Sequence, residues 1–252
     1  MVLLKTLVEF LDETLGTANF GNDGSNNGLQ VEASTEVSKI GFAVDGCLES
    51  FERASLLGCD LIVVHHGISW GGSLKRIVGI DAKRIKVLFS NELSLYASHL
   101  PLDAHPTLGH NAVICQQLGL TDVHPFAEYA GYKIGFYGSL PEAVTLDALK
   151  NKLNTILDTT SISLGENDLI RKIGVVSGGA ADEISDAAKE GLDAFVTGEF
   201  VHQHVHLVQE LGIPLIAAGH YKTEVPGVKA LATLLEENFA VETVFIDLPT
   251  GY

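Results

Sequence analysis

The sequence predicts an α/β protein made of two related α/β lobes with mixed, partly parallel sheets. Two observations lead to this prediction: short apolar runs alternate with segments of helical periodicity, and one strand–helix–strand pattern occurs twice. Alternation of this kind is typical of parallel strands joined by helices. The chain has 252 residues, of which 46% are hydrophobic and 19% charged, so it can bury a large core.

An amphipathic helix is expected at the start of the chain, because Leu4, Leu7, Leu11 and Leu15 recur at helical spacing. A Gly/Asn-rich loop follows over residues 19–29. Strands are then predicted at 40–44, 61–64, 95–98, 132–137, 173–176, 194–197, 214–217 and 244–247. Helices are predicted near 48–57, 83–93, 109–118, 145–157, 181–190, 200–211 and 225–237.

An internal repeat indicates that the two lobes are related. Residues 39–66 and 172–199 align without a gap, from a shared Lys-Ile-Gly at the start to a shared Gly-x-Asp before the last strand. Each segment predicts one βαβ unit. We therefore expect an N-terminal lobe over residues 1–125 and a C-terminal lobe over 126–252, with the boundary at the His124-Pro125 pair.

The charge of the chain excludes one class of function. With 16 basic and 32 acidic residues, the formal net charge is -16. Such a surface repels phosphate backbones, so we expect no non-specific binding of nucleic acid. An anionic small-molecule substrate would need a local positive field, which bound cations provide.

The cysteines and the apolar segments indicate the compartment. Cys47, Cys59 and Cys115 form an odd set without C-x-x-C spacing, which favours thiols in a reducing cytosol over disulfides or a thiolate zinc site. Acidic residues interrupt the apolar N-terminal run, and no apolar stretch is long enough to span a bilayer. We expect a soluble, cytoplasmic protein that does not associate with membranes.

Two adjacent histidines are the first candidates for a metal site. His65 and His66 follow the apolar run 61–64 directly and precede Gly67. Neighbours in a regular strand point to opposite faces. At the end of the strand, however, Gly67 frees the backbone, and both imidazoles can face one open site. The alternative is a pair of hydrogen-bonded core histidines. Because two histidines are adjacent here, we favour the interpretation that they are metal ligands.

Two more segments place polar side chains after predicted strands. Asp103 follows one strand, with His99 in the same loop, although Asp103 alone would suit a turn or a helix cap. His220 and Glu224 follow another strand, and their spacing of four puts them on one face if the helix begins early. Open α/β sheets bind ligands at the carboxyl ends of their strands, so we expect these side chains to converge.

The set of candidate ligands suits two metal ions better than one. Three imidazoles and two carboxylates exceed the ligands of a single catalytic zinc ion that keeps an open position. They suit two divalent ions that share a bridging carboxylate and a water molecule. Nitrogen and oxygen donors without a thiolate suit Fe, Zn, Mn or Co, and the sequence does not choose among them.

Several segments together resemble the Nif-three-like dinuclear-metal family, whose members are commonly labelled type 2 GTP cyclohydrolase I homologues. These segments are His65-His66-Gly67, residues 98–103, Gly198-Glu199 and residues 218–224. In addition, Asn27-Gly28-Leu29-Gln30-Val31 resembles the N-terminal element of that family. The match extends from about residue 5 to the C-terminus, in the family's order and spacing.

The resemblance implies a particular distribution of the ligands. His65 and Asp103 would bind one ion, His66 and His220 the other, and Glu224 would bridge the two. It also implies that two divalent ions per subunit lie between the two lobes, and that the protein is a ring-shaped homohexamer built from dimers.

The ligands and the resemblance favour a metal-dependent hydrolase that activates a bridging water against a nucleotide or another phosphorylated substrate. With GTP, the attack would fall on C8 of the imidazole ring and open it toward dihydroneopterin triphosphate. His99 and Glu199 are the candidates for proton transfer. A phosphoesterase is the nearest alternative chemistry. A metal-binding or regulatory protein without turnover is the alternative from another class.

Other residues have two interpretations each. His202, His204 and His206 lie on one predicted helix, where His202 and His206 share a face and could form a third metal site or a basic lining of the cavity, but a solvent-facing helix is favoured. The pairs Gly71-Gly72 and Gly178-Gly179 lack the Lys-Ser/Thr of a P-loop and are expected to be turns. Trp70 could stack on a base, but a buried anchor is the default expectation.

Overall fold

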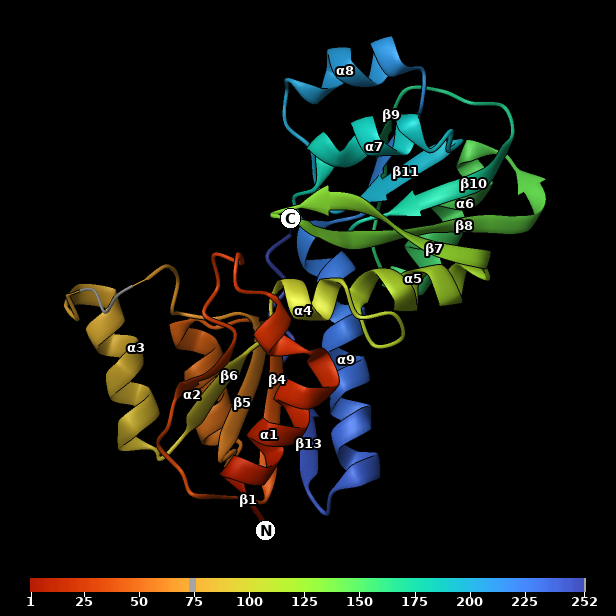
Figure 1. Ribbon diagram of the computed structural model, residues 1–252. Helices are drawn as coiled ribbons and strands as arrows, with labels where there is room; N and C mark the ends of the chain where they lie inside the picture. The colour runs from red at the N-terminus through yellow and green to blue at the C-terminus, as the bar shows by residue number, and fades with distance from the viewer. Residues whose placement is uncertain (73–75, 252) are drawn as a thin grey trace. The chain divides into compact units, whose positions relative to one another are not determined.

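The computed structural model describes residues 1–72 and 76–251, and the chain divides into two compact units (Figure 1). Unit 1 comprises Met1–Leu102 and Val228–Leu248, and unit 2 comprises Asp103–Gly227 and Pro249–Tyr252. This division differs from the boundary expected near residue 125. Pro125 lies inside a strand, β7 (Thr121–Tyr129), and the chain returns to unit 1 near its end.

Unit 1 contains a five-stranded sheet with the order β13-β4-β5-β6-β2. Its strands are β13 (Glu242–Phe245), β4 (Lys39–Asp45), β5 (Leu61–His66), β6 (Ser94–Ala97) and β2 (Gly28–Val31). The first four are parallel, and β2 is antiparallel at the edge. The other elements are β1 (Val2–Leu3), β3 (Glu36–Val37), α1 (Leu4–Leu15), a 3₁₀ turn over Thr17–Asn19, α2 (Leu48–Leu56) and α3 (Gly79–Ser90).

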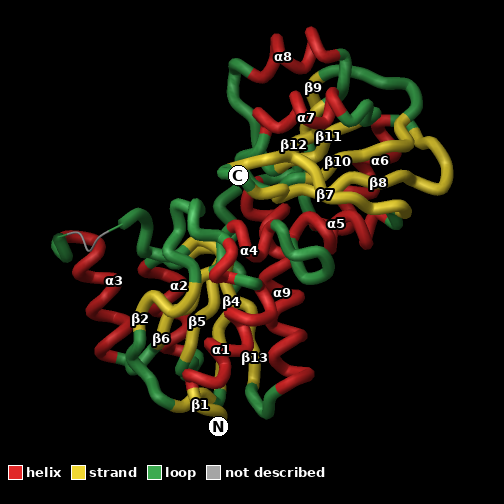
Figure 2. Tube along the Cα trace, in the orientation of Figure 1, coloured by secondary structure: helices red, strands yellow, loops and turns green. Residues whose placement is uncertain are grey.

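Unit 2 contains a six-stranded sheet with the order β7-β8-β10-β11-β12-β9. The strands besides β7 are β8 (Tyr132–Val144), β10 (Ile170–Val175), β11 (Ala194–Thr197), β12 (Leu215–Ala217) and β9 (Ile162–Leu164). Strands β10, β11 and β12 are parallel, and β7, β8 and β9 join antiparallel. Its helices include α5 (His110–Leu118), α6 (Leu146–Leu157), α7 (Ile184–Lys189) after a 3₁₀ turn over Ala181–Glu183, and α8 (His204–Leu211). The mixed α/β class is thus confirmed (Figure 2).

Two helices extend across the division of the chain. The short α4 (Leu100–Asp103) ends on the first residue of unit 2, and α9 (His220–Asn238) begins in unit 2 and continues into unit 1. Helix α9 starts before the predicted residue 225, so Pro226 lies inside it rather than in its first turn. No helix in the described part of the chain has the length and apolar character needed to cross a membrane.

The repeat inferred from the sequence is present in both sheets. The units β4-α2-β5 and β10-α7-β11 have the same register, since Ile40 pairs with Leu61 and Ile173 with Ala194. The Asp before the second strand also has the same contact in each. The Asp60 carboxylate accepts a hydrogen bond from the Lys39 N–H at 3.0 Å, and Asp193 accepts one from the Lys172 N–H at 2.8 Å.

Each unit buries its own apolar core. Helix α1 buries the four leucines predicted from their spacing and ends at Gly16, whose φ is 61°. The three cysteines are free thiols. Cys59 lies in the core of unit 1, where burial raises its pKa to about 11. Cys115 lies in the core of unit 2, where burial raises its pKa to about 12.

Candidate metal centre

Three histidines of unit 1 form a cluster at the carboxyl ends of β5 and β6. His65 and His66 end β5, His99 follows β6, and one ring nitrogen from each lies within 4.8 Å of the others. The ring centroids of His65 and His66 are 4.6 Å apart, and those of His65 and His99 are 5.1 Å apart. The strands are parallel neighbours, so their ends meet at one edge of the sheet. The structure therefore brings His99 beside the predicted doublet.

The Nδ1 atom of each of these histidines faces an oxygen acceptor. The partners are the Ser98 carbonyl for His65, the Asp45 carboxylate for His66 and the Asp23 carboxylate for His99, each at 2.9 Å. Carbonyl and carboxylate oxygens only accept, so Nδ1 carries the proton in the neutral ring and Nε2 carries the lone pair. Metal-binding histidines commonly have this arrangement, because the outer oxygen fixes the tautomer and the orientation of the ring.

Asp23 was not predicted from the sequence, although it organises this cluster. Its side chain is only 1% exposed and accepts hydrogen bonds from the N–H groups of Ser25 and Leu100, each at 3.0 Å. It also accepts from the Asn27 side chain at 2.8 Å. Burial acts to raise the pKa of Asp23, but the hydrogen bonds from His99 and Asn27 outweigh it and hold the pKa at about 2.

The element Asn27 to Gln30 joins the two loops that carry the histidines. Asn27 Oδ1 accepts from the His99 N–H at 2.7 Å. Gln30 Oε1 accepts from the N–H groups of Ile68 and Ser69, at 2.8 and 3.0 Å. Gly67 is required here for space rather than for a positive φ, since a Cβ at this position would collide with the Gln30 side chain.

In unit 2, two predicted ligands lie on one face of α9. His220 and Glu224 occupy its start, and His220 Nε2 is 3.1 Å from Glu224 Oε1. His220 Nδ1 is 3.0 Å from Glu199 Oε1, at the turn that follows β11. The hydrogen bond with Glu224 raises the pKa of His220 to about 9 although burial opposes it, and Glu199 adds to the rise. Two carboxylates thus favour a cation at this position, either the imidazolium proton or a metal ion.

Asp103, the third predicted ligand of unit 2, is the last residue of α4 and not a helix cap. It is only 6% exposed, and its Oδ1 accepts a hydrogen bond from the Ser177 hydroxyl at 3.0 Å. The Asn111 side chain donates to the Asp103 carbonyl at 3.4 Å. A buried carboxylate that accepts from a neighbouring hydroxyl, on a backbone held by the Asn111 amide, has the character of a preorganised oxygen ligand.

Glycines leave room for the His220–Glu224 pair. Gly178 has a φ of +68°, and a Cβ at this position would collide with the Glu224 carboxylate. A Cβ on Gly198 would lie 2.7 Å from the His220 Cα. The Thr223 hydroxyl lies 2.9 Å from the carbonyl oxygens of Gly219 and His220, to which it donates, and it accepts the Gly178 N–H at 3.0 Å.

The remaining candidates separate into distinct environments. His202 and His206 are exposed, with ring centroids 6.2 Å apart, whereas His204 is buried. His204 Nδ1 accepts the Val201 N–H and its Nε2 lies 2.9 Å from Asp182, so this ring has a structural role. The expectation that Trp70 is a buried anchor was wrong, because this side chain is 38% exposed.

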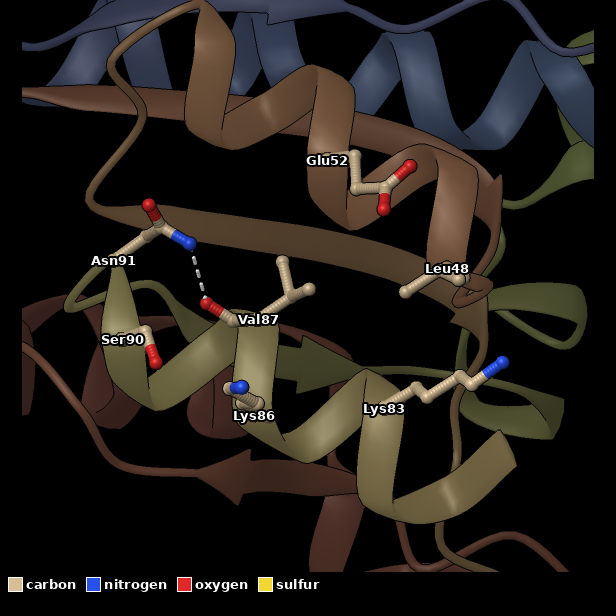
Figure 3. Close-up of a pocket in the computed structure, with 7 residues that line it drawn as sticks. All are labelled: Leu48, Glu52, Lys83, Lys86, Val87, Ser90 and Asn91. Carbon is tan, nitrogen blue, oxygen red and sulfur yellow. Dashed lines mark hydrogen bonds between the residues drawn. The ribbon is translucent and has the colours of Figure 1, made fainter. Parts of the chain in front are cut away.

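A pocket lies away from all of these residues. It has a volume of about 330 Å³ and lies between α2 and α3 in unit 1 (Figure 3). Its lining combines apolar, basic, acidic and amide groups: Leu48, Glu52, Lys83, Lys86, Val87, Ser90 and Asn91. None of the predicted site residues lines this pocket.

The fold and these residues define a class: an α/β protein whose repeated βαβ units present histidines and carboxylates at the carboxyl ends of their parallel strands. The chain belongs to the Duf34/NIF3 (NGG1p interacting factor 3) family, whose profile matches residues 2–251. The family resemblance inferred from the sequence is thereby confirmed.

Individual relatives agree with this membership. A Pyrococcus abyssi protein named GTP cyclohydrolase 1 type 2 homolog is 42% identical, over 97% of this chain and 98% of its own length. An Archaeoglobus fulgidus protein of the same name is also 42% identical, over 98% and 99% of the two chains. A crystal structure of a Thermus thermophilus protein superposes with a TM-score of 0.91 at 38% identity and covers 100% of both chains.

Proposed function

We propose that this protein is a metal-dependent hydrolase that uses two divalent ions. The ligands would be the five residues assigned by the family resemblance: His65, His66, Asp103, His220 and Glu224. The main support is the hydrogen bonding of the histidines. In both units a fixed oxygen acceptor holds Nδ1, which assigns Nε2 as the ligating nitrogen.

The donor set fits such ions. It combines imidazole nitrogens with buried carboxylate oxygens and contains no thiolate, which suits Fe, Zn, Mn or Co. His65 and Asp103 would hold one ion, His66 and His220 the other, and Glu224 would contact both. When bound, the ions would supply Lewis acidity and an activated water. They would also give a strongly acidic protein a local positive charge that attracts an anionic substrate.

The residues around the ligands would have separate roles. His99 is the candidate for proton transfer, because Asp23 orients its ring and one of its ring nitrogens lies in the cluster with His65 and His66. Glu199 Oε1 accepts from His220, so we assign Glu199 chiefly to orienting that ligand. The proposed substrate is a nucleotide such as GTP, with hydrolysis at C8 of the base, and a phosphoester is the alternative. We also propose that the protein acts in the cytoplasm as a homohexamer.

Metal analysis is the first test. The protein would be purified without chelators or a histidine tag, and metal per chain would be measured by elemental analysis. We expect about two ions per chain, and loss of most of this metal in His66→Ala combined with Glu224→Ala. His202→Ala, which changes an exposed histidine, is the matched control and should keep its metal. A wild type that neither contains nor takes up Fe, Mn, Co or Zn would contradict the proposal.

Turnover is the second test. The metal-loaded protein would be incubated with GTP and with generic phosphoesters, and products would be separated by chromatography. Ring opening of GTP supports the cyclohydrolase chemistry, whereas phosphate release supports the phosphoesterase alternative. Bound metal without turnover of either substrate would reject both hydrolases and leave a metal-binding protein. Glu224→Gln should abolish turnover while the circular dichroism spectrum stays unchanged.

A further inference from the structure

Trp70 is the single tryptophan of the chain, and it is exposed beside the histidine cluster. It follows the strand end that carries His65 and His66 by four residues, and 38% of it is accessible to solvent. A large aromatic side chain gains most from burial, so a partly open indole forgoes stabilisation that a core position would provide. Its position next to candidate ligands calls for a reason other than packing.

The indole is held in a fixed orientation. Its Nε1–H donates to the Gly67 carbonyl at 2.9 Å. Trp70 forms an antiparallel bridge with Ser25, and the Gly71 N–H donates to the Gly24 carbonyl at 2.9 Å. The Asn26 side chain donates to the Gly71 carbonyl at 2.9 Å. The backbone on both sides of the ring is therefore tied to the preceding loop, so the ring loses little conformational freedom when a ligand binds.

The ring also lies at the right place to contact a ligand of the cluster. Its centroid is 5.2 Å from that of His99, with the planes inclined at 70°. This is an edge-to-face contact, which does not occupy an indole face with a parallel ring. Among the described residues, no other aromatic ring pairs with Trp70 in the observed ring contacts. A planar ring stacked on the indole would thus lie near His99, which belongs to the histidine cluster.

We propose that Trp70 is a stacking surface for the planar heteroaromatic ring of a ligand, namely the base of a nucleotide. The choice of a nucleotide rests on the proposed function. Stacking itself rests on the exposed and immobilised indole. Every base presents a π-face, so bases of any identity stack on aromatic side chains, and loss of one such contact weakens binding roughly 5- to 150-fold.

The experiment uses the intrinsic fluorescence of the wild-type protein, which reports on Trp70 alone when tryptophan is excited selectively. The protein would be titrated with GTP, with guanosine and with inorganic tripolyphosphate. We expect GTP and guanosine to quench the emission and tripolyphosphate to leave it unchanged. Quenching by tripolyphosphate as strong as that by GTP would overturn the proposal, since the phosphates alone would then account for the signal.

Two variants separate stacking from structural support. Trp70→Phe and Trp70→Leu both lose the hydrogen bond to Gly67, but only the phenylalanine keeps a π-face. Binding of GTP would be measured by calorimetry, and folding by thermal melting. We expect GTP to bind roughly 5- to 150-fold more weakly to the leucine variant and with near-normal affinity to the phenylalanine variant. Equal affinity in wild type and Trp70→Leu would overturn the proposal. Quenching by guanosine without any turnover would support stacking while rejecting only the hydrolase.

Discussion

Each repeated βαβ unit supplies one member of a histidine–carboxylate pair at the end of its second strand, but this member is a histidine in unit 1 and a carboxylate in unit 2. In unit 1, Asp45 at the end of β4 holds His66 at the end of β5. In unit 2, the position equivalent to Asp45 is Gly178, and the position equivalent to His66 is Glu199. Glu199 instead holds His220 at the start of α9. The backbone repeat therefore fixes the position after the second strand, and the residue there decides whether the imidazole comes from this position, as in unit 1, or from helix α9, as in unit 2.

The largest effect should come from filling the space at Gly178. Gly178→Ala would place a methyl group against the Glu224 carboxylate and force a non-glycine residue to adopt a φ of +68°. We expect loss of bound metal together with a destabilisation of about 1–2 kcal/mol from the backbone alone. Metal content and thermal melting would measure the two effects.

Gly191→Ala is the control for that substitution. Gly191 has a φ of +64°, but a Cβ there would meet nothing within 4 Å. It should therefore reproduce the backbone cost and keep the metal. Equal metal content in both alanine variants would show that the space at Gly178 does not matter for Glu224.

A smaller effect should follow from weakening the pairs themselves. Asp45→Asn and Glu199→Gln keep the shape of each partner of His66 and His220 but remove its charge. We expect each to lower metal affinity about 10- to 100-fold, since partners of this kind orient the ligand and raise its basicity. Competition with a chelator would measure this. Asp122→Asn, which changes the exposed partner of His124, is the control and should have no effect. Very unequal losses at Asp45 and Glu199 would refute the equivalence of the two pairs.

The thermal stability of the metal-free protein should depend on pH through His220 of unit 2. The pKa of His220 is raised from 6.5 to about 9, so the charged imidazole stabilises the folded state. This contribution is complete below pH 6.5 and is lost as the pH rises through about 9. Thermal melting between these pH values should show a declining midpoint in wild type and a smaller decline in Glu199→Gln. An identical decline in both proteins would contradict this role of Glu199.

The smallest effect concerns the thiols of the two cores. Cys59 and Cys115 are buried and their pKa values are raised to about 11 and 12, whereas Cys47 is only partly buried. A thiol reagent should therefore label Cys47 alone in the native protein. Labelling followed by mass spectrometry along a denaturant series would show whether Cys59 and Cys115 become reactive together. Rapid native labelling of Cys115 would contradict the observed packing of unit 2.

The sequence predicted those features that local periodicity encodes. The sequence predicted helix α1 with its four buried leucines and the bounds of β11. It also predicted that His220 and Glu224 share one face of a helix. Strand β7 was missed because Thr121–Tyr129 contains Asp, His and Pro and is stabilised by its antiparallel pairing with β8.

The supporting contacts of the site could not be read in the same way. Asp23 lies 76 positions before His99, and its loop has the composition of an ordinary turn. Its function depends on a long-range hydrogen bond, for which no local pattern exists. The only indication in the sequence was the element Asn27 to Gln30, which resembles the N-terminal element of the family. This resemblance indicates that the segment matters for the site, but it does not predict which residues the segment contacts.

The division of the chain has a consequence for folding. The edge strand β13 pairs with β4, so the sheet that carries His65 and His66 joins residues 242–245 to residues 39–42. Closing so long a loop costs more chain entropy than pairing β4, β5 and β6, which lie closer together in the sequence, so we expect β13 to join the sheet late. A truncation before residue 242 would remove the outer strand of unit 1, which lies next to β4 in space although it is far from β4 in the sequence.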